Sequence, residues 1–380
     1  MKQFEYVIAG AGAAGLTLAY LLVNGQNSKK SIAIIDKAGK STNDRTWCFW
    51  EKGPNLLENL VYKSWEKGHF ESDTFTNTYD LAPYRYKMIR GIDFYQFMRE
   101  HLQAHGNVQW IQDEIKSISA DGELQLSQEV IQGKIVFDST RHFQSFENLD
   151  QYTTLLQHFK GYFLKTKKPV FDPDTFTYMG LNIPQEGDFR FGYVLPFSET
   201  NALVEYTIFN THMLEDEVYD QRVKSYIKDN LGIEEYEVYE EEFGVIPMSD
   251  YPFPFKISDH HYHIGISGGF AKASTGYTFL RSQKILAQLV KNLENNKQLL
   301  SQLPYRQKRF KKYDSTLLKV LAKEDNVGRH AFSDMFEKNG MHKMFRFLDE
   351  ETSLGEELAI MGSTPLLTFG KAFMRSMVRG

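Results

Sequence analysis

The stretch "YVIAGAGAAGLTLAYLL" (residues 6–22) places a glycine-rich turn between two apolar segments. The first segment, 4–9, predicts a buried β-strand. Gly10, Gly12 and Gly15 follow it at G-x-G-x-x-G spacing, and the apolar residues after them recur at the spacing of a helix. A strand, a glycine turn and a helix in this order are typical of the first unit of a dinucleotide-binding fold.

Each residue of this pattern has a physical role. Gly10 makes the tight turn, Gly12 lets a pyrophosphate approach the backbone, and Gly15 lets the helix pack close to the strand. The helix N-terminus offers free N–H groups to the phosphates. The next predicted strand, "SIAIIDK" (31–37), ends at Asp36, whose carboxylate suits ribose hydroxyls and disfavours a 2′-phosphate. We therefore predict dinucleotide binding here; a purely structural glycine turn is the alternative.

The composition excludes several classes of protein. A chain of 380 residues exceeds what one core usually fills, so we expect two packed domains. A net charge of −5 argues against nucleic-acid binding. The single cysteine, Cys48, excludes an internal disulfide framework and a multi-cysteine metal site, and we predict no metal. No apolar run approaches the roughly 20 residues of a membrane span, and the N-terminus leads directly into the first strand, so we expect a cytoplasmic protein.

Aromatic residues are unusually frequent, at 14% of the chain. They indicate either a Phe-rich core or a long apolar ligand tunnel lined by rings.

A second glycine-rich segment, "YHIGISGGFAKASTGYTFLRS" (262–282), favours FAD over NAD. An NAD dehydrogenase usually completes its nucleotide fold in the N-terminal half, whereas here strand-forming sequence returns only at 129–141 and again in this late segment. That layout suits an α/β flavoprotein of the two-domain hydroxylase type, with a Rossmann-like FAD-binding domain. The late segment would form a strand, a loop and a helix over 278–293 that return to the flavin.

Four residues of the late loop are candidates for cofactor binding: Gly268, Gly269, Thr275 and Gly276. The two adjacent glycines allow close backbone approach. Such loops often carry a Gly-Asp pair for the ribityl chain, and this sequence has none. A simple strand–helix connection is the alternative. No second G-x-G-x-x-G motif is present, so no separate NAD(P) domain is expected.

We predict three regions. They are a discontinuous FAD-binding domain (1–165 and 245–300), a substrate-binding domain built on a mixed or antiparallel sheet (166–244), and a helical C-terminal region that contacts the membrane (301–380).

Six stretches together carry a family resemblance. They are "IAGAGAAGLTLAYLL" (8–22), "NDRTWCFW" (43–50), "QHFKGYFLKT" (157–166), "FRFGYVLPFSETNALVEYTIFN" (189–210), "EEFGVIPM" (241–248) and "GISGGFAKASTGYTF" (265–279). In this order they resemble lycopene cyclases, flavin-containing enzymes of carotenoid biosynthesis. The resemblance implies redox-neutral cyclisation of the linear ends of lycopene, or of a related acyclic carotenoid, to β-ionone rings. It also implies reduced FAD, NAD(P)H as external reductant, and peripheral association with the inner face of the membrane.

The resemblance selects Glu205 in "LVEYT" (203–207), which matches the family's Leu-Val-Glu-x-Thr motif. Ring closure begins when a proton adds to a terminal double bond, so the enzyme needs an acid in a dry pocket. Desolvation raises the pKa of a carboxyl and keeps it protonated. The family's second acid is replaced by Tyr206, which weakens any mechanism with two carboxylates in this motif. The alternative is a strand residue that faces water or forms an ion pair.

Four further residues are less specific candidates. Asp174 would assist proton handling or cap a turn, and Arg45 would reach the flavin or form a loop ion pair. Phe191 and Tyr193 alternate onto one strand face and offer ring faces to a cation, with core packing as the alternative.

The C-terminal segment "LLTFGKAFMRSMVRG" (366–380) has an amphipathic pattern. Its cations are Lys371, Arg375 and Arg379, and its apolar face is Leu366, Phe369, Phe373 and Met377. With the basic cluster "RQKRFKK" (306–312), this pattern predicts a membrane-surface helix; docking on the protein's own core is the alternative. The acidic stretch "EEYEVYEEE" (234–242) is interpreted as a solvated strand face.

Two other functions remain open at this point. One is a FAD-dependent monooxygenase or isoprenoid reductase on the same fold. The other is a flavin- or carotenoid-binding protein without catalysis. The residues leave ring type, the number of ends cyclised and the oligomeric state open.

Overall fold

The computed structural model describes residues 1–295, 297, 299, 308–323 and 327–378. The chain divides into two compact units, each assembled from three segments. Unit 1 contains Met1–Trp47, Arg90–Leu149 and Tyr251–Arg306, and unit 2 contains Cys48–Ile89, Asp150–Asp250 and Gln307–Gly380. This division differs from the expected one at 48–89, 150–165 and 245–250, which fall in unit 2 with the second large sheet and the small sheet. The difference arises because their strands pair with partners distant in sequence.

Unit 1 is built on a seven-stranded sheet with the order β8-β2-β1-β11-β10-β9, in which β17 also pairs with β11. The strands β8, β2, β1, β11 and β17 run parallel, and β10 pairs antiparallel with both β11 and β9. The bounds are β1 (Lys2–Ala9), β2 (Ile32–Asp36), β8 (Val108–Gln112), β9 (Ile115–Ile118), β10 (Glu123–Leu126), β11 (Val130–Asp138) and β17 (His261–His263).

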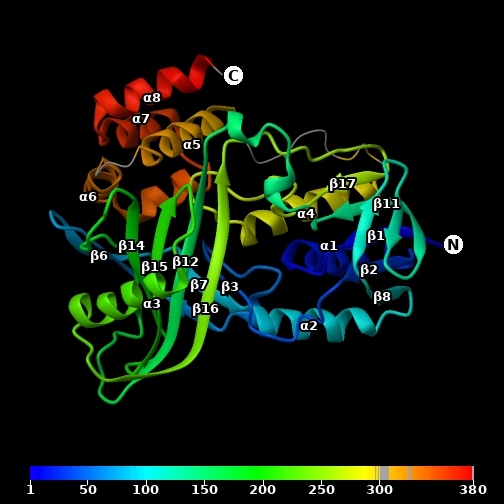
Figure 1. Ribbon diagram of the computed structural model, residues 1–380, viewed down its shortest axis with the longest axis horizontal. Helices are drawn as coiled ribbons and strands as arrows, with labels where there is room; N and C mark the ends of the chain where they lie inside the picture. The colour runs from blue at the N-terminus through cyan, green and yellow to red at the C-terminus, as the bar shows by residue number, and fades with distance from the viewer. Residues whose placement is uncertain (296, 298, 300–307, 324–326, 379–380) are drawn as a thin grey trace. The chain divides into compact units, whose positions relative to one another are not determined.

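The helices of unit 1 are α1 (Ala13–Asn24), α2 (Gly91–Gln103) and α4 (Phe279–Glu294). The helix α1 packs against both of the others (Figure 1). The predicted strand–turn–helix unit is confirmed, and β1 and β2 are apolar and buried because parallel strands are covered on both faces. The predicted late strand is shorter than expected, since the chain turns at Gly265, where φ is +65°.

Unit 2 is built on a second seven-stranded sheet, ordered β16-β12-β15-β14-β13-β5-β6. Its pairs are antiparallel except β13 with β5. The bounds are β5 (Lys67–Glu71), β6 (Thr76–Asp80), β12 (Thr154–Thr166), β13 (Thr175–Gly180), β14 (Phe189–Pro196), β15 (Asn201–Asn210) and β16 (Tyr236–Ser249). A small sheet has the order β3 (Thr46–Glu51), β7 (Arg85–Arg90), β4 (Lys63–Trp65).

Unit 2 has one α-helix, α3, between β15 and β16, and four described α-helices, α5 to α8, after β16. They are α3 (Asp216–Ser225), α5 (Lys308–Leu321), α6 (Val327–Leu348), α7 (Leu354–Gly362) and α8 (Leu366–Val378). A short π-helix, Tyr226–Asn230, extends α3. Three single-turn 3-10 helices are Glu58–Leu60, Phe143–Ser145 and Leu149–Gln151.

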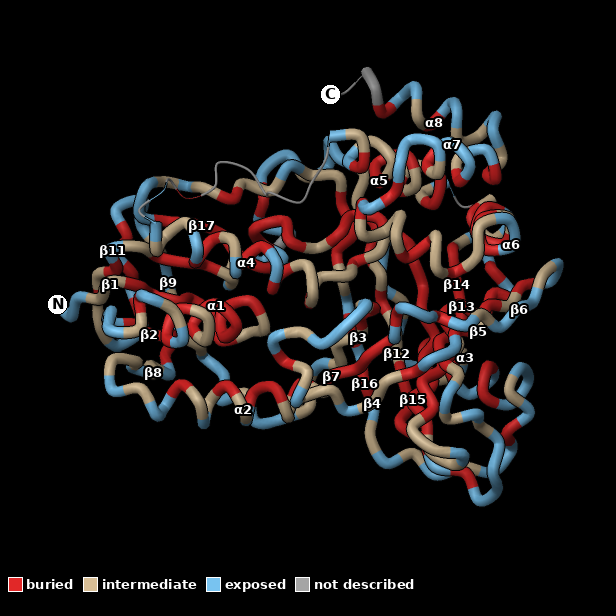
Figure 2. Tube along the Cα trace, turned by 180° about the vertical axis from the view of Figure 1, so that it is seen from behind, coloured by how far each residue is buried: buried red, intermediate tan, exposed pale blue. Residues whose placement is uncertain are grey.

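The helix α3 covers one face of the large sheet. Even-numbered residues of β15, such as Val204 and Tyr206, pack in one apolar cluster with Tyr219 and Val223 of this helix. Because side chains alternate along a strand, the odd-numbered residues of β15 lie on the opposite face. The strands β14 and β15 are buried over nearly their whole length (Figure 2).

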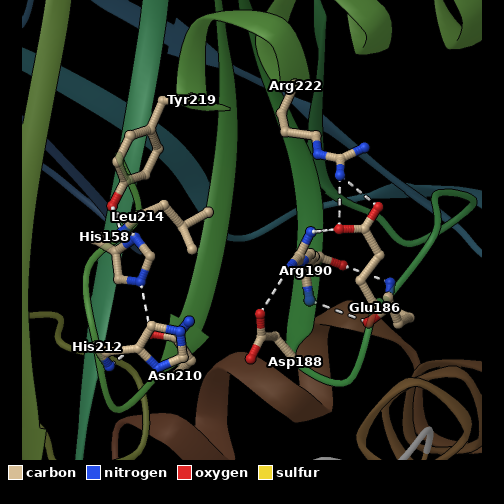
Figure 3. A network of polar contacts seen from close by, with 10 residues as sticks. His158, Glu186, Asp188, Arg190, Asn210, His212, Leu214, Tyr219 and Arg222 are labelled. Atoms are coloured by element: carbon tan, nitrogen blue, oxygen red, sulfur yellow. Dashed lines mark hydrogen bonds and ion pairs between the residues drawn. The ribbon is translucent and has the colours of Figure 1, made fainter. Parts of the chain in front are cut away.

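Polar contacts fix α3 to the sheet (Figure 3). The Tyr219 hydroxyl lies 2.7 Å from Nδ1 of His158, whose Nε2 lies 2.9 Å from Oδ1 of Asn210. Burial lowers the pKa of His158, so the ring is neutral and donates through Nε2. A second group joins buried Arg190 to Glu186, which also accepts from Arg222 of α3. The contact between His158 and Asn210 joins β12 to β15, the strand that carries Glu205.

Candidate active site

The three glycines of the first turn have distinct surroundings. Gly10 has φ +98°, and a Cβ there would lie 2.3 Å from Oγ of Ser139. A Cβ on Gly15 would lie 2.1 Å from the carbonyl oxygen of Gly10. A Cβ on Gly12 would meet no atom within 4 Å. The first and third glycines are therefore required by the protein's own packing, whereas Gly12 faces open space that a ligand can occupy.

Asp36 is held beside this turn at the end of β2. Its Oδ2 accepts a hydrogen bond from the Ala11 N–H at 2.7 Å, and its Oδ1 accepts from Ala38 at 2.8 Å. The N-terminus of α1 has no side-chain cap and no acidic residue in its first turn. Free N–H groups of this kind favour a phosphate.

The late glycine-rich segment lies beside this turn, and its predicted contact with the flavin stays a prediction. The Ile264 N–H donates to the carbonyl of Asp138 at 2.8 Å. A Cβ on Gly265 would lie 3.2 Å from Cβ of Ala14 in α1 and 3.8 Å from Cβ of Ser139. The first turn, the end of β11 and the late loop thus meet within unit 1.

The other late-loop candidates shape the loop itself. A Cβ on Gly268 would lie 2.4 Å from the carbonyl oxygen of His263, and Gly269 and Gly276 have φ of +74° and +71°. The Thr275 N–H donates to Lys272. These contacts explain the glycines through backbone geometry, and a cofactor role for the four residues stays a prediction.

Arg45 is exposed in unit 1. Its guanidinium donates to the carbonyl of Asp44 at 2.6 Å, and its own carbonyl accepts from the Gly91 N–H at 2.7 Å. Its role toward the flavin stays a prediction.

A buried group of Asp138, His261 and His263 lies at the β11–β17 pair, with its ligand-type atoms within 4.8 Å of one another. Nδ1 of His263 lies 3.0 Å from the Pro254 carbonyl, and Thr140 donates to Asp138 through its N–H and hydroxyl. Burial acts to raise the pKa of Asp138, but the interaction with nearby His261 and the hydrogen bonds from Thr140 outweigh it, and the pKa is lowered. Nε2 of His261 and of His263 lie 3.4 Å and 3.7 Å from Oδ2 of Asp138, so the group links β11 to β17 through polar contacts.

Glu205 belongs to a row that crosses four strands of unit 2. Glu205 pairs with Tyr193 of β14 on one side and with Gly161 of β12 on the other. Gly161 in turn pairs with Glu242 of β16. The row Tyr193–Glu205–Gly161–Glu242 therefore places two carboxyl side chains on one face of the sheet, on either side of a glycine.

The Glu205 side chain is buried, with 7% of its surface exposed. It leans over the glycine: a Cβ on Gly161 would lie 2.7 Å from Cγ of Glu205 and 2.9 Å from Cδ1 of Leu203. Desolvation, and then the charge of Glu242, raise the pKa of Glu205 well above its ordinary value. The predicted burial beside an apolar side chain is confirmed, and the alternative of a water-facing residue is wrong.

The sequence pattern did not identify Glu242 as a candidate site residue. Its stretch, 234–242, was expected to be a solvated face, and for Glu242 this is wrong, since only 6% of it is exposed whereas Glu241 is exposed. Side chains of β16 alternate between two faces, and this alternation is the signal that the sequence contains. Only the pairing of β16 with β12 shows that the face carrying Glu242 is the buried one.

Aromatic side chains surround the Tyr193 end of the row. The Tyr193 hydroxyl lies 2.8 Å from the Tyr86 hydroxyl. The Tyr86 ring stacks on the Phe176 ring, with centroids 4.0 Å apart. Further rings contact these two: Trp65, Tyr178 and Phe345. Burial raises the pKa of the nearby Cys48 thiol, which hydrogen-bonds Tyr193 and stays neutral. Phe191 and Tyr193 are both buried, and the alternation of β14 puts them on one face, as predicted.

Asp174 does not join the row. It is exposed in the turn before β13, where its N–H donates to Oδ1 of Asp172 at 3.0 Å and its carbonyl accepts from Lys67. The contacts are those of a turn, and nothing in them supports proton handling.

The helix α8 docks on α5 through buried Ala372 and Ser376. Its outer side is exposed and carries Leu366, Leu367, Lys371, Met374 and Arg375. The exposed apolar residues thus differ from the predicted set, in which Phe373 instead lies against Tyr313.

The rest of the predicted basic surface is only partly described. In the cluster 306–312, Arg309 pairs with buried Glu357 at 3.0 Å. Residues 306, 307 and 379 and the side chain of Met377 lie outside the described residues. No helix among the described residues has the length and hydropathy to cross a membrane.

Comparison with solved structures defines the class of fold. A geranylgeranyl bacteriochlorophyll reductase-like protein from Thermoplasma acidophilum matches with 12% identity, a TM-score of 0.61 and 98% of each chain covered. A flavoprotein/dehydrogenase from Cytophaga hutchinsonii matches with 13% identity, a TM-score of 0.60 and 99% and 100% coverage. A probable FAD-dependent monooxygenase from Pseudomonas aeruginosa gives 11% identity, a TM-score of 0.55 and 92% and 100% coverage. The fold is that of the Rossmann-type flavoproteins, as predicted.

The family follows from the sequence profile described as lycopene cyclase protein, which matches residues 5–374. The chain belongs to the lycopene cyclase family. A comparison with curated proteins gave no significant match.

Proposed function

We propose that this protein cyclises the linear ends of lycopene to β-ionone rings by acid catalysis, with reduced FAD as a cofactor that undergoes no net redox change. The observation that carries the proposal is Glu205: a carboxyl on a sheet face, 7% exposed, with its pKa raised by desolvation. A protonated carboxyl in an apolar surrounding is what protonation of an alkene requires. Family membership supplies the carotenoid substrate class.

In this proposal Glu205 protonates the terminal double bond. The neighbouring alkene attacks the resulting cation, forming the ring bond, and loss of a proton from the ring completes an isomerisation. Phe191 and Tyr193 present ring faces that stabilise positive charge. The surrounding aromatic wall excludes water, which would otherwise add to the cation.

Unit 1 suits the ADP half of FAD. We propose the open space beside Gly12 and the uncapped first turn of α1 for the pyrophosphate, and Asp36 for the ribose; the open space and the missing side-chain cap support this. Arg45 and the late loop, with Gly268, Gly269, Thr275 and Gly276, are proposed for the remainder of the cofactor. When bound and reduced by external NAD(P)H, the flavin would supply negative charge that stabilises a cation.

We further propose that the outer side of α8 contacts an anionic membrane surface at the cytoplasmic face. Exposed Leu366, Leu367 and Met374 lie on one short helix with Lys371 and Arg375. Apolar residues beside cations are the pattern of an interfacial helix.

Expression in a lycopene-accumulating host, followed by pigment chromatography, tests the reaction. Cyclised carotenoid in place of lycopene is expected. Unchanged lycopene, with the protein expressed and carrying flavin, would overturn the proposal.

A further inference from the structure

Redox-neutral cyclisation needs a base as well as an acid, because one proton enters the substrate and another leaves it. Glu205 is the only acid of its motif, since Tyr206 follows it. The fold nevertheless brings a second carboxyl to the same face, from a strand that the motif does not include. This deepens the proposed function and rests on it.

We propose that Glu242 is the base, and that Glu205 and Glu242 form a pair that shares one proton across Gly161. Both residues pair directly with Gly161, one from each neighbouring strand. Strands lie about 4.8 Å apart, so the two Cα atoms are roughly 10 Å apart, and only the glycine lies between them. The Glu205 side chain closes part of that gap, because its Cγ occupies the space that a Gly161 Cβ would take.

Burial and the repulsion between the two carboxyls favour a single negative charge on the pair. Tyr193 flanks Glu205 on β14, and Cys48 hydrogen-bonds Tyr193 within reach of both carboxyl charges. Two buried carboxylates this close repel each other, so one holds a proton while the other is ionised.

The proton balance then closes without a co-reactant. Glu205 gives its proton to the terminal alkene carbon, whose π electrons form the new C–H bond. The neighbouring alkene closes the ring, and Glu242 takes the proton from the carbon beside the cation as the C–H electrons form the ring double bond. Proton transfer from Glu242 back to Glu205 restores the pair.

The test uses the flavin-loaded protein with lycopene in vesicles. Glu242→Gln is expected to lower kcat by about 100-fold or more, with KM and flavin content unchanged. The high-pH limb of the rate profile should move to lower pH, because Glu205 loses the neighbouring negative charge. Glu242→Asp keeps that charge and should leave the limb in place with intermediate kcat. Glu241→Gln, on the exposed side of β16, is the matched control and should retain parental kcat.

If Glu242→Gln keeps kcat within threefold of the parent and the high-pH limb of its rate profile does not move, the proposed proton-sharing pair is wrong. If the parent protein itself leaves lycopene unchanged, the proposed function has failed, and infrared spectroscopy without substrate decides on the pair. A protonated-carboxyl band at pH 7 that is lost in Glu205→Gln and titrates at lower pH in Glu242→Gln supports it. The absence of such a band overturns it.

Discussion

Glu205 and Gly161 lie directly opposite each other on β15 and β12, and the Glu205 side chain fills the space that a larger residue at 161 would need. The missing side chain at 161 explains how a carboxyl can be buried in a strand of a closely packed sheet. It also makes Gly161 a position at which the acid can be displaced without removing it.

Gly161→Ala tests this relationship. The new Cβ would lie 2.7 Å from Cγ of Glu205, so the acid must move, at a cost of about 1–3 kcal/mol in unfolding free energy. We expect cyclisation to fall by about 100-fold, since small misplacements at a reacting centre have effects of this size. Gly355→Ala on α7, where a Cβ meets no atom within 4 Å, is the control. Parental activity in Gly161→Ala would show that the position of Glu205 is unimportant.

The pH dependence of stability follows from the raised pKa of Glu205. A carboxyl whose pKa is higher in the folded state favours folding below its unfolded pKa of about 4.5, and this stability is lost as the pH rises through the folded pKa. Glu205→Gln resembles the protonated acid and removes the effect. Thermal melts from pH 5 to 8 should therefore show a flatter profile for Glu205→Gln and a stability at pH 8 at least equal to that of the parent. Parallel profiles for both proteins would argue against a raised pKa.

Flavin binding is tested by the contrast between two glycines. Gly12 has extended backbone angles, φ −82° and ψ −175°, and open space around its Cβ position. Gly12→Ala should fold with a free energy of unfolding within about 0.5 kcal/mol of the parent, yet lose FAD absorbance, because the new methyl group occupies the pyrophosphate position. Gly15→Ala should instead destabilise the fold through contact with the Gly10 carbonyl. Full flavin content in Gly12→Ala would contradict the assignment of the site.

Membrane contact is tested by charge reversal on α8. Because α8 packs on α5, deleting it would also uncover protein core, so point variants are preferable. The double variant Lys371→Glu with Arg375→Glu should bind anionic vesicles about 30-fold or more weakly in a flotation assay. Each cation near an anionic surface contributes about 1 kcal/mol of binding free energy, and the variant loses two cations. The exposed pair Lys167→Glu with Lys168→Glu makes the same change in net charge and should bind as the parent does. Equal loss in both variants would indicate net charge and not this helix.

Local patterns sufficed for the first βα unit, because its glycines, its helix and Asp36 act over short sequence distances. Glu205 needed the family motif, and its burial agrees with the prediction from Leu203 on the same face. Glu242 could not be predicted, because β16 pairs with β12 from far along the chain and the other acidic residues of the stretch are exposed or partly exposed. The division into units was missed for the same reason: strands β5 and β12 join the second sheet through long-range pairing.

Conversion of lycopene by purified, reduced, FAD-loaded protein, compared between the parent and Glu205→Gln, tests the central claim most directly. The parent should form cyclised carotenoid without stoichiometric oxidation of NAD(P)H, and Glu205→Gln should form none while it retains flavin. Parental turnover in Glu205→Gln, or one NAD(P)H oxidised per product, would contradict acid-catalysed, redox-neutral cyclisation.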